Sequence, residues 1–233
     1  MSAQKMQEAM EQDGLRPAQQ IIADGRPHRI KDLQDTAKDS RMFYVCFGDA
    51  GYYMHHARLI EGRKWSAKRE TEFTPEEKRD YAIKMQQAIE LRRKEEEQRH
   101  TECRERSAII WDNAPLAPNN HPYLVKKGVT AYELKLHKGR LVVPVYDVED
   151  TLHGLQYIGE DGGKKFEPGT AVKGNFSYIV GDKEKPLYIC EGWATGATIH
   201  AATGATVIIA FACGNLKPVA EAVRVKVGGE SCR

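Results

Sequence analysis

The pattern of apolar and polar residues divides the chain into three kinds of sequence. Short runs of strand-forming residues characterise its beginning, above all residues 42–47 and, across a glycine turn, residues 52–56. A helical and mostly charged pattern follows from Thr74 to about Asp112. Short apolar runs return after Pro122 and are separated by turns rich in glycine and aspartate. The pattern predicts an α+β region, a long helix and a further α/β region.

The long helix has a clear beginning and a charged middle. Thr74 starts a capping box, with Pro75 at the first helical position and Glu77 three residues after the cap. At 1.5 Å per residue, the predicted helix is roughly 55 Å long. Apolar residues mark its two ends, whereas residues 91–106 are nearly all charged. Such a segment is predicted to be either a solvated connector or an arm that binds a partner.

Near the end of the chain, two short apolar strands alternate with two helices. Residues 187–190 and 207–211 have the composition of buried strands, and about one crossover separates them. Helices are predicted at residues 194–202 and 217–224. This order predicts two parallel strands whose carboxyl ends lie at the same edge of a sheet. An exposed edge of so small a sheet must be covered by the preceding region, by a second copy, or not at all, so we expect some self-association.

Two further strands are predicted upstream of this pair. Residues 140–146 and 152–158 should pair antiparallel around a turn at residues 147–150. The predicted fold class is therefore α/β, with four regions along the chain. These are a small α+β region (1–73) that begins with a helix near residues 2–10, the charged helix (74–114), a subdomain (115–185) and a partial parallel α/β unit (186–233).

The overall charge gives no strong indication of nucleic-acid binding, but its distribution is more informative. The 35 Lys and Arg residues nearly cancel the 33 Asp and Glu residues, which leaves a formal net charge of +2. Residues 26–69 nevertheless carry ten basic side chains against five acidic ones, and residues 121–141 carry five against one. Each segment is either a phosphate-contacting surface or an ordinary solvated face.

The spacing of the cysteines and the hydropathy of the chain predict the cellular compartment of the protein. The five cysteines lie far apart and form no Cys-x-x-Cys pair, which argues against a structural zinc site and a disulfide framework. There is no apolar run near 18 residues and no leader with a charged start and an apolar centre. We therefore expect a cytoplasmic protein with reduced thiols and no membrane segment.

Two groups of potential metal ligands have simpler explanations. His55 and His56 are neighbours in a predicted strand, so their side chains point to opposite faces and cannot easily share one ion. Asp147, Glu149 and Asp150 lie in a predicted turn, where aspartate is favoured for its hydrogen bonds to the backbone. We therefore favour structural roles for both groups.

Glu191 is the most informative residue of the chain. It follows the first of the two parallel strands and precedes a helix that begins with Gly192. Backbone N–H groups and the positive end of the helix dipole converge there. A purely structural carboxylate at that position stabilises the helix by typically about 0.3–1 kcal/mol. The functional alternative is that Glu191 takes part in chemistry at the carboxyl edge of the sheet.

Several segments resemble Toprim primases of plasmids and phages. Residues 189–224, ICEGWATGATIHAATGATVIIAFACGNLKPVAEAVR, resemble the opening half of the Toprim catalytic domain. Residues 121–129, 139–145 and 154–166 are similar to the amino-terminal subdomain of those primases. Residues 23–29 look like the region that precedes it. The resemblance covers nearly the whole chain.

This resemblance implies specific roles for nine residues. Glu191 would act as a general base, or through Mg²⁺ or Mn²⁺, on an attacking 3′-hydroxyl. The resemblance also implies contacts to phosphate by Gly192, Thr195 and Gly196, and to a nucleotide by Asn215, which could alternatively cap the next helix. The implied contacts to DNA are those of Lys126, Lys127, Arg140 and Lys164. Lys164 and Lys165 lie in a Gly-rich turn, where simple solvation is the favoured alternative for both.

One departure from the family limits the implied function. Toprim enzymes pair the motif glutamate with an Asp-x-Asp motif on a later strand, and no Asp follows Asp182 here. Because two-metal chemistry needs several carboxylates, the resemblance implies a primase-type protein that binds single-stranded DNA and is catalytically incomplete as it stands. One alternative is a primase that uses ribonucleoside triphosphates and is completed by another chain. A second is a non-catalytic protein whose charged helix binds a replicative helicase.

Overall fold

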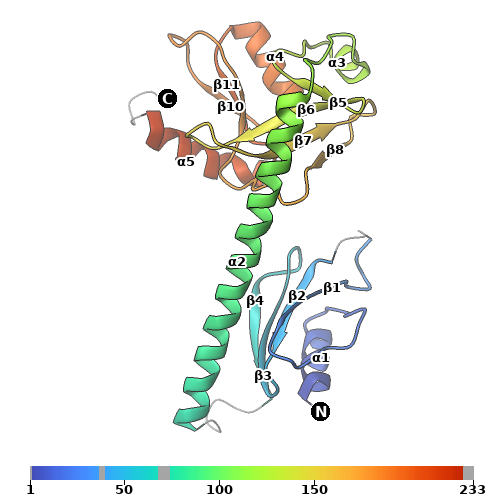
Figure 1. The fold of residues 1–233 in the computed structure, drawn as a ribbon, viewed down its shortest axis with the longest axis vertical. Coiled ribbons are helices and arrows are strands. Elements are labelled where there is room, and N and C mark those ends of the chain that lie inside the picture. The colour runs from blue at the N-terminus through green and yellow to red at the C-terminus, as the bar shows by residue number, and fades with distance from the viewer. Residues whose placement is uncertain (1, 37–39, 68–73, 228–233) are drawn as a thin grey trace. The chain divides into compact units, whose positions relative to one another are not determined.

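Helix α2 (Pro75–Asn113) is the longest element of the chain. The computed structural model describes residues 2–36, 40–67 and 74–227. The chain divides into two units, Met1–Glu95 and Glu96–Arg233, and the division falls inside α2, drawn in green in Figure 1. The long helix predicted from the capping box is confirmed, and each unit contains one part of it.

The amino-terminal unit contains a helix packed on an antiparallel sheet. Strands β1 (Pro27–Ile30), β2 (Met42–Cys46), β3 (Ala50–His55) and β4 (Leu59–Ser66) are neighbours in chain order. Helix α1 (Ser2–Gln12) covers one face, and its Met6 and Met10 are completely buried. Alternate side chains of the strands join that core, because successive residues of a strand point to opposite faces. The predicted first helix and the strands β2 and β3 are confirmed.

The second unit contains a four-stranded antiparallel sheet. Its strands, in the order in which they pair, are β5 (Lys135–His137), β6 (Arg140–Tyr146), β7 (Leu152–Ile158) and β8 (Lys164–Phe166). Helix α3 (Pro122–Lys127) precedes this sheet, with the His121 side chain accepting a hydrogen bond from the Tyr123 N–H at its start. The predicted antiparallel pair β6 and β7 is confirmed.

A smaller sheet with parallel strands follows in the same unit. Strands β10 (Tyr188–Cys190) and β11 (Val207–Ile209) pair in parallel, as predicted, around helix α4 (Trp193–Thr203). The 3-10 turn η2 (Cys213–Asn215) and helix α5 (Leu216–Val227) come after β11. Strand β9 (Ser177–Ile179) pairs antiparallel with β11. The preceding region of the chain therefore covers one edge of the parallel pair.

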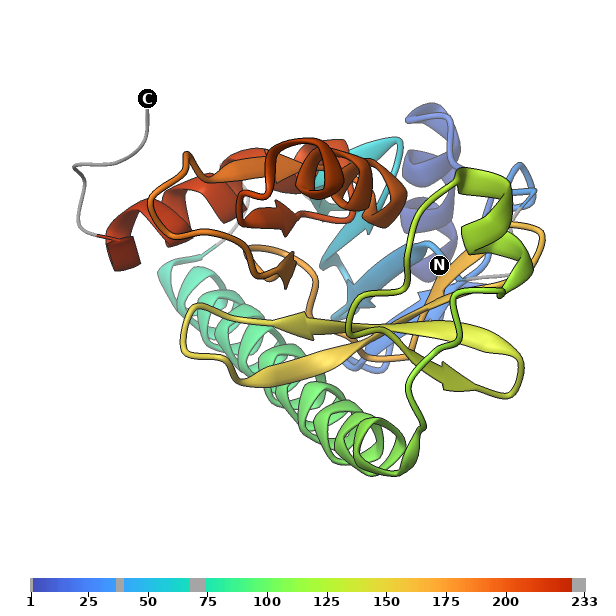
Figure 2. The same ribbon diagram turned by 90° about the horizontal axis from the view of Figure 1, so that it is seen from above.

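The two sheets of the second unit share one core. Leu141 and Ile158 of the first sheet belong to the same buried cluster as Val207 and Ile209 of β11. Helix α4 packs on this side of the smaller sheet, and α5 packs on the other side against Ile208 (Figure 2). One face of the antiparallel sheet is consequently directed toward the parallel strands, and that face can supply side chains to their carboxyl edge.

The second part of α2 packs on its own unit. Cys103 is completely buried, and His100 Nδ1 donates a hydrogen bond to the Gly169 carbonyl oxygen at 2.7 Å. A Cβ atom on Gly169 would lie only 2.7 Å from the Arg99 carbonyl oxygen, and its φ of +93° also favours glycine. Part of the charged segment 91–106 is therefore packed, which a purely solvated connector would not be.

The part of the chain that the structure describes contains no candidate for a membrane-spanning helix. No helix there combines the length and the apolar character that crossing a bilayer requires.

Candidate functional site

Glu191 lies directly after β10, at the carboxyl edge of the parallel strands. Gly192 is the N-cap of α4, in an extended conformation with φ of −126°, and no side chain caps the helix by a hydrogen bond. The Glu191 side chain is exposed. Within residues 2–36, 40–67 and 74–227, no group forms a hydrogen bond or an ion pair with its carboxylate. The carboxylate therefore does not cap α4 and is accessible to a ligand.

Lys164 of β8 brings a positive charge to the same place. Its Nζ lies 3.2 Å from the position that a Cβ atom would occupy on Gly192. The ladder explains this direction: Lys164 pairs with Ile158, a core residue, whereas Lys165 pairs with Tyr157 and points to the opposite face. The sequence-predicted residues Lys164 and Glu191 thus come from distant segments to one end of α4.

The thiol of Cys190 is affected by this arrangement. Burial raises the pKa of Cys190, and the positive charge of Lys164 acts in the opposite direction. The Cys190 Sγ also lies 3.6 Å from the Gly192 carbonyl oxygen, to which it donates a weak hydrogen bond. A thiol with a raised pKa is a poor nucleophile, so Cys190 is a packing residue.

Thr195 completes the accessible polar groups in the first turn of α4. Its side chain is exposed, and no hydrogen bond to its hydroxyl occurs among the described residues. The N–H groups of a first helical turn lack partners within the helix, so they also favour an anion. We call Glu191, Gly192, Thr195 and Lys164 the β10 edge.

Two aromatic residues at this edge were not identified from the sequence. The rings of Phe166 in β8 and Phe211 after β11 meet edge to face, with centroids 5.5 Å apart. Phe211 adopts a left-handed backbone conformation with φ of 68°, which costs about 1–3 kcal/mol for a residue other than glycine. No local pattern signals this contact, because it depends on two sheets packing together.

Gly196 and Asn215, which were predicted to contact phosphate and a nucleotide, also have structural roles within the second unit. A Cβ atom on Gly196 would lie 3.0 Å from Ile209 Cγ1 and 3.2 Å from Cys190 Sγ, so this glycine faces the strands. Its N–H donates to the Gly192 carbonyl oxygen at 3.0 Å, and its predicted contact with phosphate stays a prediction. Gly196 allows α4 to pack closely on the sheet.

The side-chain amide of Asn215 is used entirely within the chain. Its Oδ1 accepts a hydrogen bond from the Gly174 N–H at 2.7 Å. Its Nδ2 donates to the carbonyl oxygens of Val172, Asn175 and Ala210, each at 2.9 Å. Asn215 therefore holds the preceding loop against the end of β11, and the predicted nucleotide contact stays a prediction.

The remaining predicted DNA contacts lie in α3 and β6. Lys126 and Lys127 are exposed in the last turn of α3. Arg140 precedes Leu141 in β6, so it points away from the core face that carries Lys164. Its guanidinium lies 5.9 Å from the centre of the Tyr157 ring. Arg140 and Lys164 are consequently on opposite faces of one sheet.

The acidic turn between β6 and β7 has the structural role that we favoured. Asp147 Oδ1 accepts hydrogen bonds from the N–H groups of Glu149 and Thr151, and Oδ2 contacts His153 Nε2 at 2.8 Å. Burial would raise the pKa of Asp147, but these contacts hold it below its ordinary value. No group of three potential metal ligands occurs among the described residues, so Glu191 does not belong to such a group.

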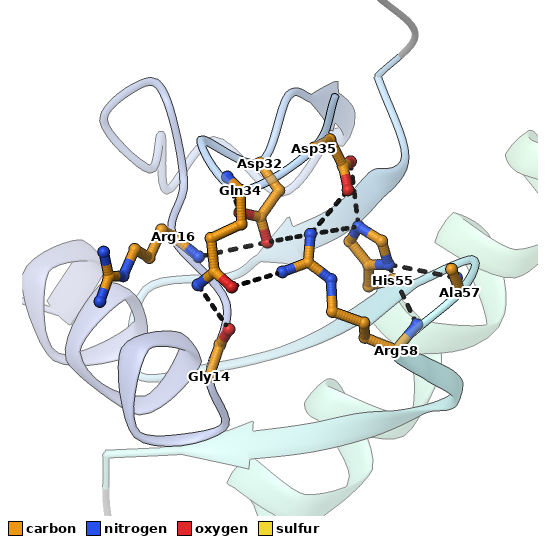
Figure 3. Close-up of polar contacts among 8 residues, drawn as sticks. All are labelled: Gly14, Arg16, Asp32, Gln34, Asp35, His55, Ala57 and Arg58. Atoms are coloured by element: carbon orange, nitrogen blue, oxygen red, sulfur yellow. Dashed lines mark hydrogen bonds and ion pairs between the residues drawn. The ribbon is translucent and has the colours of Figure 1, made fainter. Parts of the chain in front are cut away.

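A second polar cluster lies in the amino-terminal unit, and we call Asp32, Asp35, His55 and Arg58 the Asp32 cluster (Figure 3). His55 is completely buried, and its Nδ1 accepts hydrogen bonds from the N–H groups of Ala57 and Arg58. This assigns the ring proton to Nε2, which donates to Asp35 Oδ2 at 3.1 Å. Both nitrogens are used internally, so His55 is not available to a metal ion.

Arg58 links the two carboxylates of the Asp32 cluster. Its Nη2 lies 2.6 Å from Asp35 Oδ1 and 3.3 Å from Asp32 Oδ2. Asp32 also accepts hydrogen bonds from the N–H groups of Arg16 and Gln34. Burial would raise the pKa of Asp35, but the hydrogen bonds from His55 and Arg58 outweigh it and lower the pKa. The cluster is satisfied within the unit.

The chain is similar to characterised DNA primases. It is 32% identical over 221 residues to DNA primase TraC of Escherichia coli, a match that covers 88% of this chain and 20% of the relative. A second Escherichia coli DNA primase TraC is 35% identical over 112 residues, covering 45% of this chain and 8% of the relative. The chain therefore spans about a fifth of the length of the first relative. No protein-family model and no solved structure matches it.

Proposed function

We propose that this chain is a primase-type Toprim protein of a plasmid or phage replication system and binds single-stranded DNA through its second unit. Its homology to DNA primase TraC supports a primase-related role in replication. The observation that carries the proposal is the β10 edge, where Glu191 and Lys164 lie at the start of α4 without internal partners among the described residues.

The chemistry of the β10 edge suits a phosphate group. A helix N-terminus offers backbone N–H donors and a partial positive charge, and Lys164 adds a full one. The Thr195 hydroxyl can donate to a phosphate oxygen from the first turn of α4. Lys126 and Lys127 provide further exposed charges in the same unit. Such contacts give weak, salt-sensitive binding with little preference among bases.

Divalent metal ions are the cofactor that primer synthesis would need. Mg²⁺ keeps several of its waters and binds a lone carboxylate weakly. The described residues offer Glu191 at this edge without a group of three metal ligands, so they do not fit a complete metal site. We therefore assign no catalytic step to a metal ion here and propose that the chain alone holds DNA without extending it.

The test compares the chain with its Glu191→Gln variant in two assays. In an anisotropy titration with single-stranded DNA, we expect both proteins to bind, the variant at least as tightly because it lacks a negative charge beside the phosphate. Ribonucleotide incorporation on the same template, with Mg²⁺ or Mn²⁺, should be absent from both. Failure of the unmodified chain to bind DNA would contradict the proposal.

A different result would favour the second candidate, a primase completed by another chain. In that case, incorporation would appear with the unmodified protein and disappear with Glu191→Gln, while DNA binding persisted. A Glu160→Gln variant is the matched control, because Glu160 is an exposed carboxylate outside the β10 edge and its substitution should change neither assay.

A further inference from the structure

A groove lies within the amino-terminal unit, on the sheet face opposite α1. Phe43, Val45 and Tyr52 form its floor from β2 and β3. The first part of α2 contributes Met85, Ala88, Ile89 and Arg92, and β4 contributes Lys64. The groove has a volume of about 240 Å³. All of these residues precede Glu95, so the groove is a feature of this unit alone.

The side chains of the groove combine apolar surface with positive charge. Phe43 and Tyr52 are an aromatic pair with centroids 6.4 Å apart. The Arg92 guanidinium lies 4.8 Å from the centre of the Phe43 ring and also contacts Met54 Sδ. Lys64 and Arg92 are the charged residues among the described lining, which includes no carboxylate. The groove is therefore suited to a ligand that is flat, apolar and joined to a negative charge.

Arg92 has an unsatisfied donor at this groove. Its Nε is buried and has no hydrogen-bond partner within the described residues. Buried donors are nearly always paired, and a charged donor without a partner is destabilising. Nε is too deeply buried for a ligand to reach it, so a ligand would contact Arg92 through the end of its guanidinium. There Nη1 donates a weak hydrogen bond to Met54 Sδ at 3.7 Å, and no carboxylate of the described lining balances the positive charge, which favours an anionic ligand.

We propose that this groove binds a base of single-stranded DNA, with Lys64 and Arg92 contacting the neighbouring phosphates. Proteins that bind single strands combine aromatic surfaces for the bases with cations for the backbone. The volume of about 240 Å³ is below the roughly 300–1,000 Å³ of pockets for drug-sized ligands, which favours one planar base. A docked helix needs a longer groove for anchors at several turns.

The local charge of the chain supports the same ligand. Residues 26–69, which include the sheet of this unit, carry ten basic side chains against five acidic ones. A positively charged region attracts a phosphate backbone whatever its sequence. The site is separate from the β10 edge, which belongs to the other unit, so the two sites can be tested independently.

The first test uses Lys64→Gln in the full chain, with a short fluorescent oligothymidylate as the probe. The Lys64→Gln variant loses one phosphate contact, so the slope of log affinity against log salt concentration should become shallower by about one. At about 0.1 M salt, this change corresponds to a roughly fivefold to tenfold weaker affinity. Lys94→Gln is the matched control, since Lys94 is 68% exposed on the same unit and does not line the groove. Equal affinities of the two variants would overturn the proposal.

A second test separates the base from the phosphates. An abasic strand of the same length should bind about tenfold more weakly than oligothymidylate, because stacking of one base contributes about 1–3 kcal/mol. Ala88→Leu fills the groove without changing its charge and should reduce that difference. If a folded Ala88→Leu variant still binds oligothymidylate about tenfold more tightly than the abasic strand, the bases bind elsewhere.

Photo-crosslinking locates the base without any variant. A strand containing iododeoxyuridine should crosslink to peptides that contain Phe43 or Tyr52, as read by mass spectrometry. Crosslinks confined to the second unit would overturn the groove proposal and leave DNA binding at the β10 edge intact. Crosslinks in neither unit, with no binding in solution, would instead contradict both proposals.

Discussion

The Asp32 cluster and the β10 edge both contain carboxylates and basic side chains, but these are buried and paired in the cluster and exposed and unpaired at the edge, among the described residues. In the Asp32 cluster, Arg58 and His55 contact two carboxylates that are almost completely buried. At the β10 edge, Glu191 and Lys164 are exposed, and neither forms an ion pair with another described residue.

We propose that this difference separates the structural role of the Asp32 cluster from a ligand-binding role of the β10 edge. A buried charge must be paired and hydrogen-bonded, because moving a charged group out of water without giving it a partner costs several kcal/mol. Once those partners lie within the chain, the group has little capacity left for a ligand. A charge at the end of a strand remains hydrated and can exchange water for a phosphate. The contacts of a charged residue therefore say more about whether it can bind a ligand than its residue type does.

The largest effect is expected from breaking the Asp32 cluster. Asp32→Ala removes a completely buried carboxylate that accepts hydrogen bonds from two backbone N–H groups and contacts Arg58. We expect the free energy of unfolding of the amino-terminal unit to fall by about 3 kcal/mol in urea titration. The exposed Glu8→Ala is the control and should change it by less than about 0.5 kcal/mol. Equal effects would show that the cluster does not stabilise the unit.

A smaller effect is expected from acid. The pKa of Asp35 is lowered in the folded chain, so its ionised form stabilises the fold above the pKa of the unfolded chain, near 3.8. That contribution is lost as the pH falls below about 4, through the lower folded pKa. Urea midpoints should therefore decrease between about pH 5 and about pH 3, and Asp35→Asn should flatten the decrease. An unchanged slope in Asp35→Asn would contradict this assignment.

Local sequence patterns predicted the elements of the chain well. The capping box at Thr74 gave the start of α2 within one residue, because its signal is confined to four neighbouring positions. The parallel pairing of β10 and β11 followed from the helix between them. The turn at Asp147 was also predicted correctly, since its hydrogen bonds are made within five residues.

Residues of the candidate site could be predicted only where neighbouring residues in the sequence determine their place in the fold. Glu191 could be placed at the end of a strand from neighbouring residues alone. Predicting that Gly196 packs on Ile209, or that Phe166 meets Phe211, requires knowing how two sheets pack. The internal hydrogen bonds of Asn215 could not be predicted for the same reason, because its partner Gly174 lies 41 residues away in the chain.

The most direct test of the account compares charge reversal at two neighbouring lysines. Lys164→Glu places a negative charge beside Gly192, whereas Lys165→Glu changes the opposite face of the same strand. We expect Lys164→Glu to weaken binding to single-stranded DNA about tenfold and to reduce its salt dependence, with Lys165→Glu within about twofold of the unmodified chain. Equal loss in both variants would mean that DNA responds only to overall charge, and the β10 edge would not be the binding site.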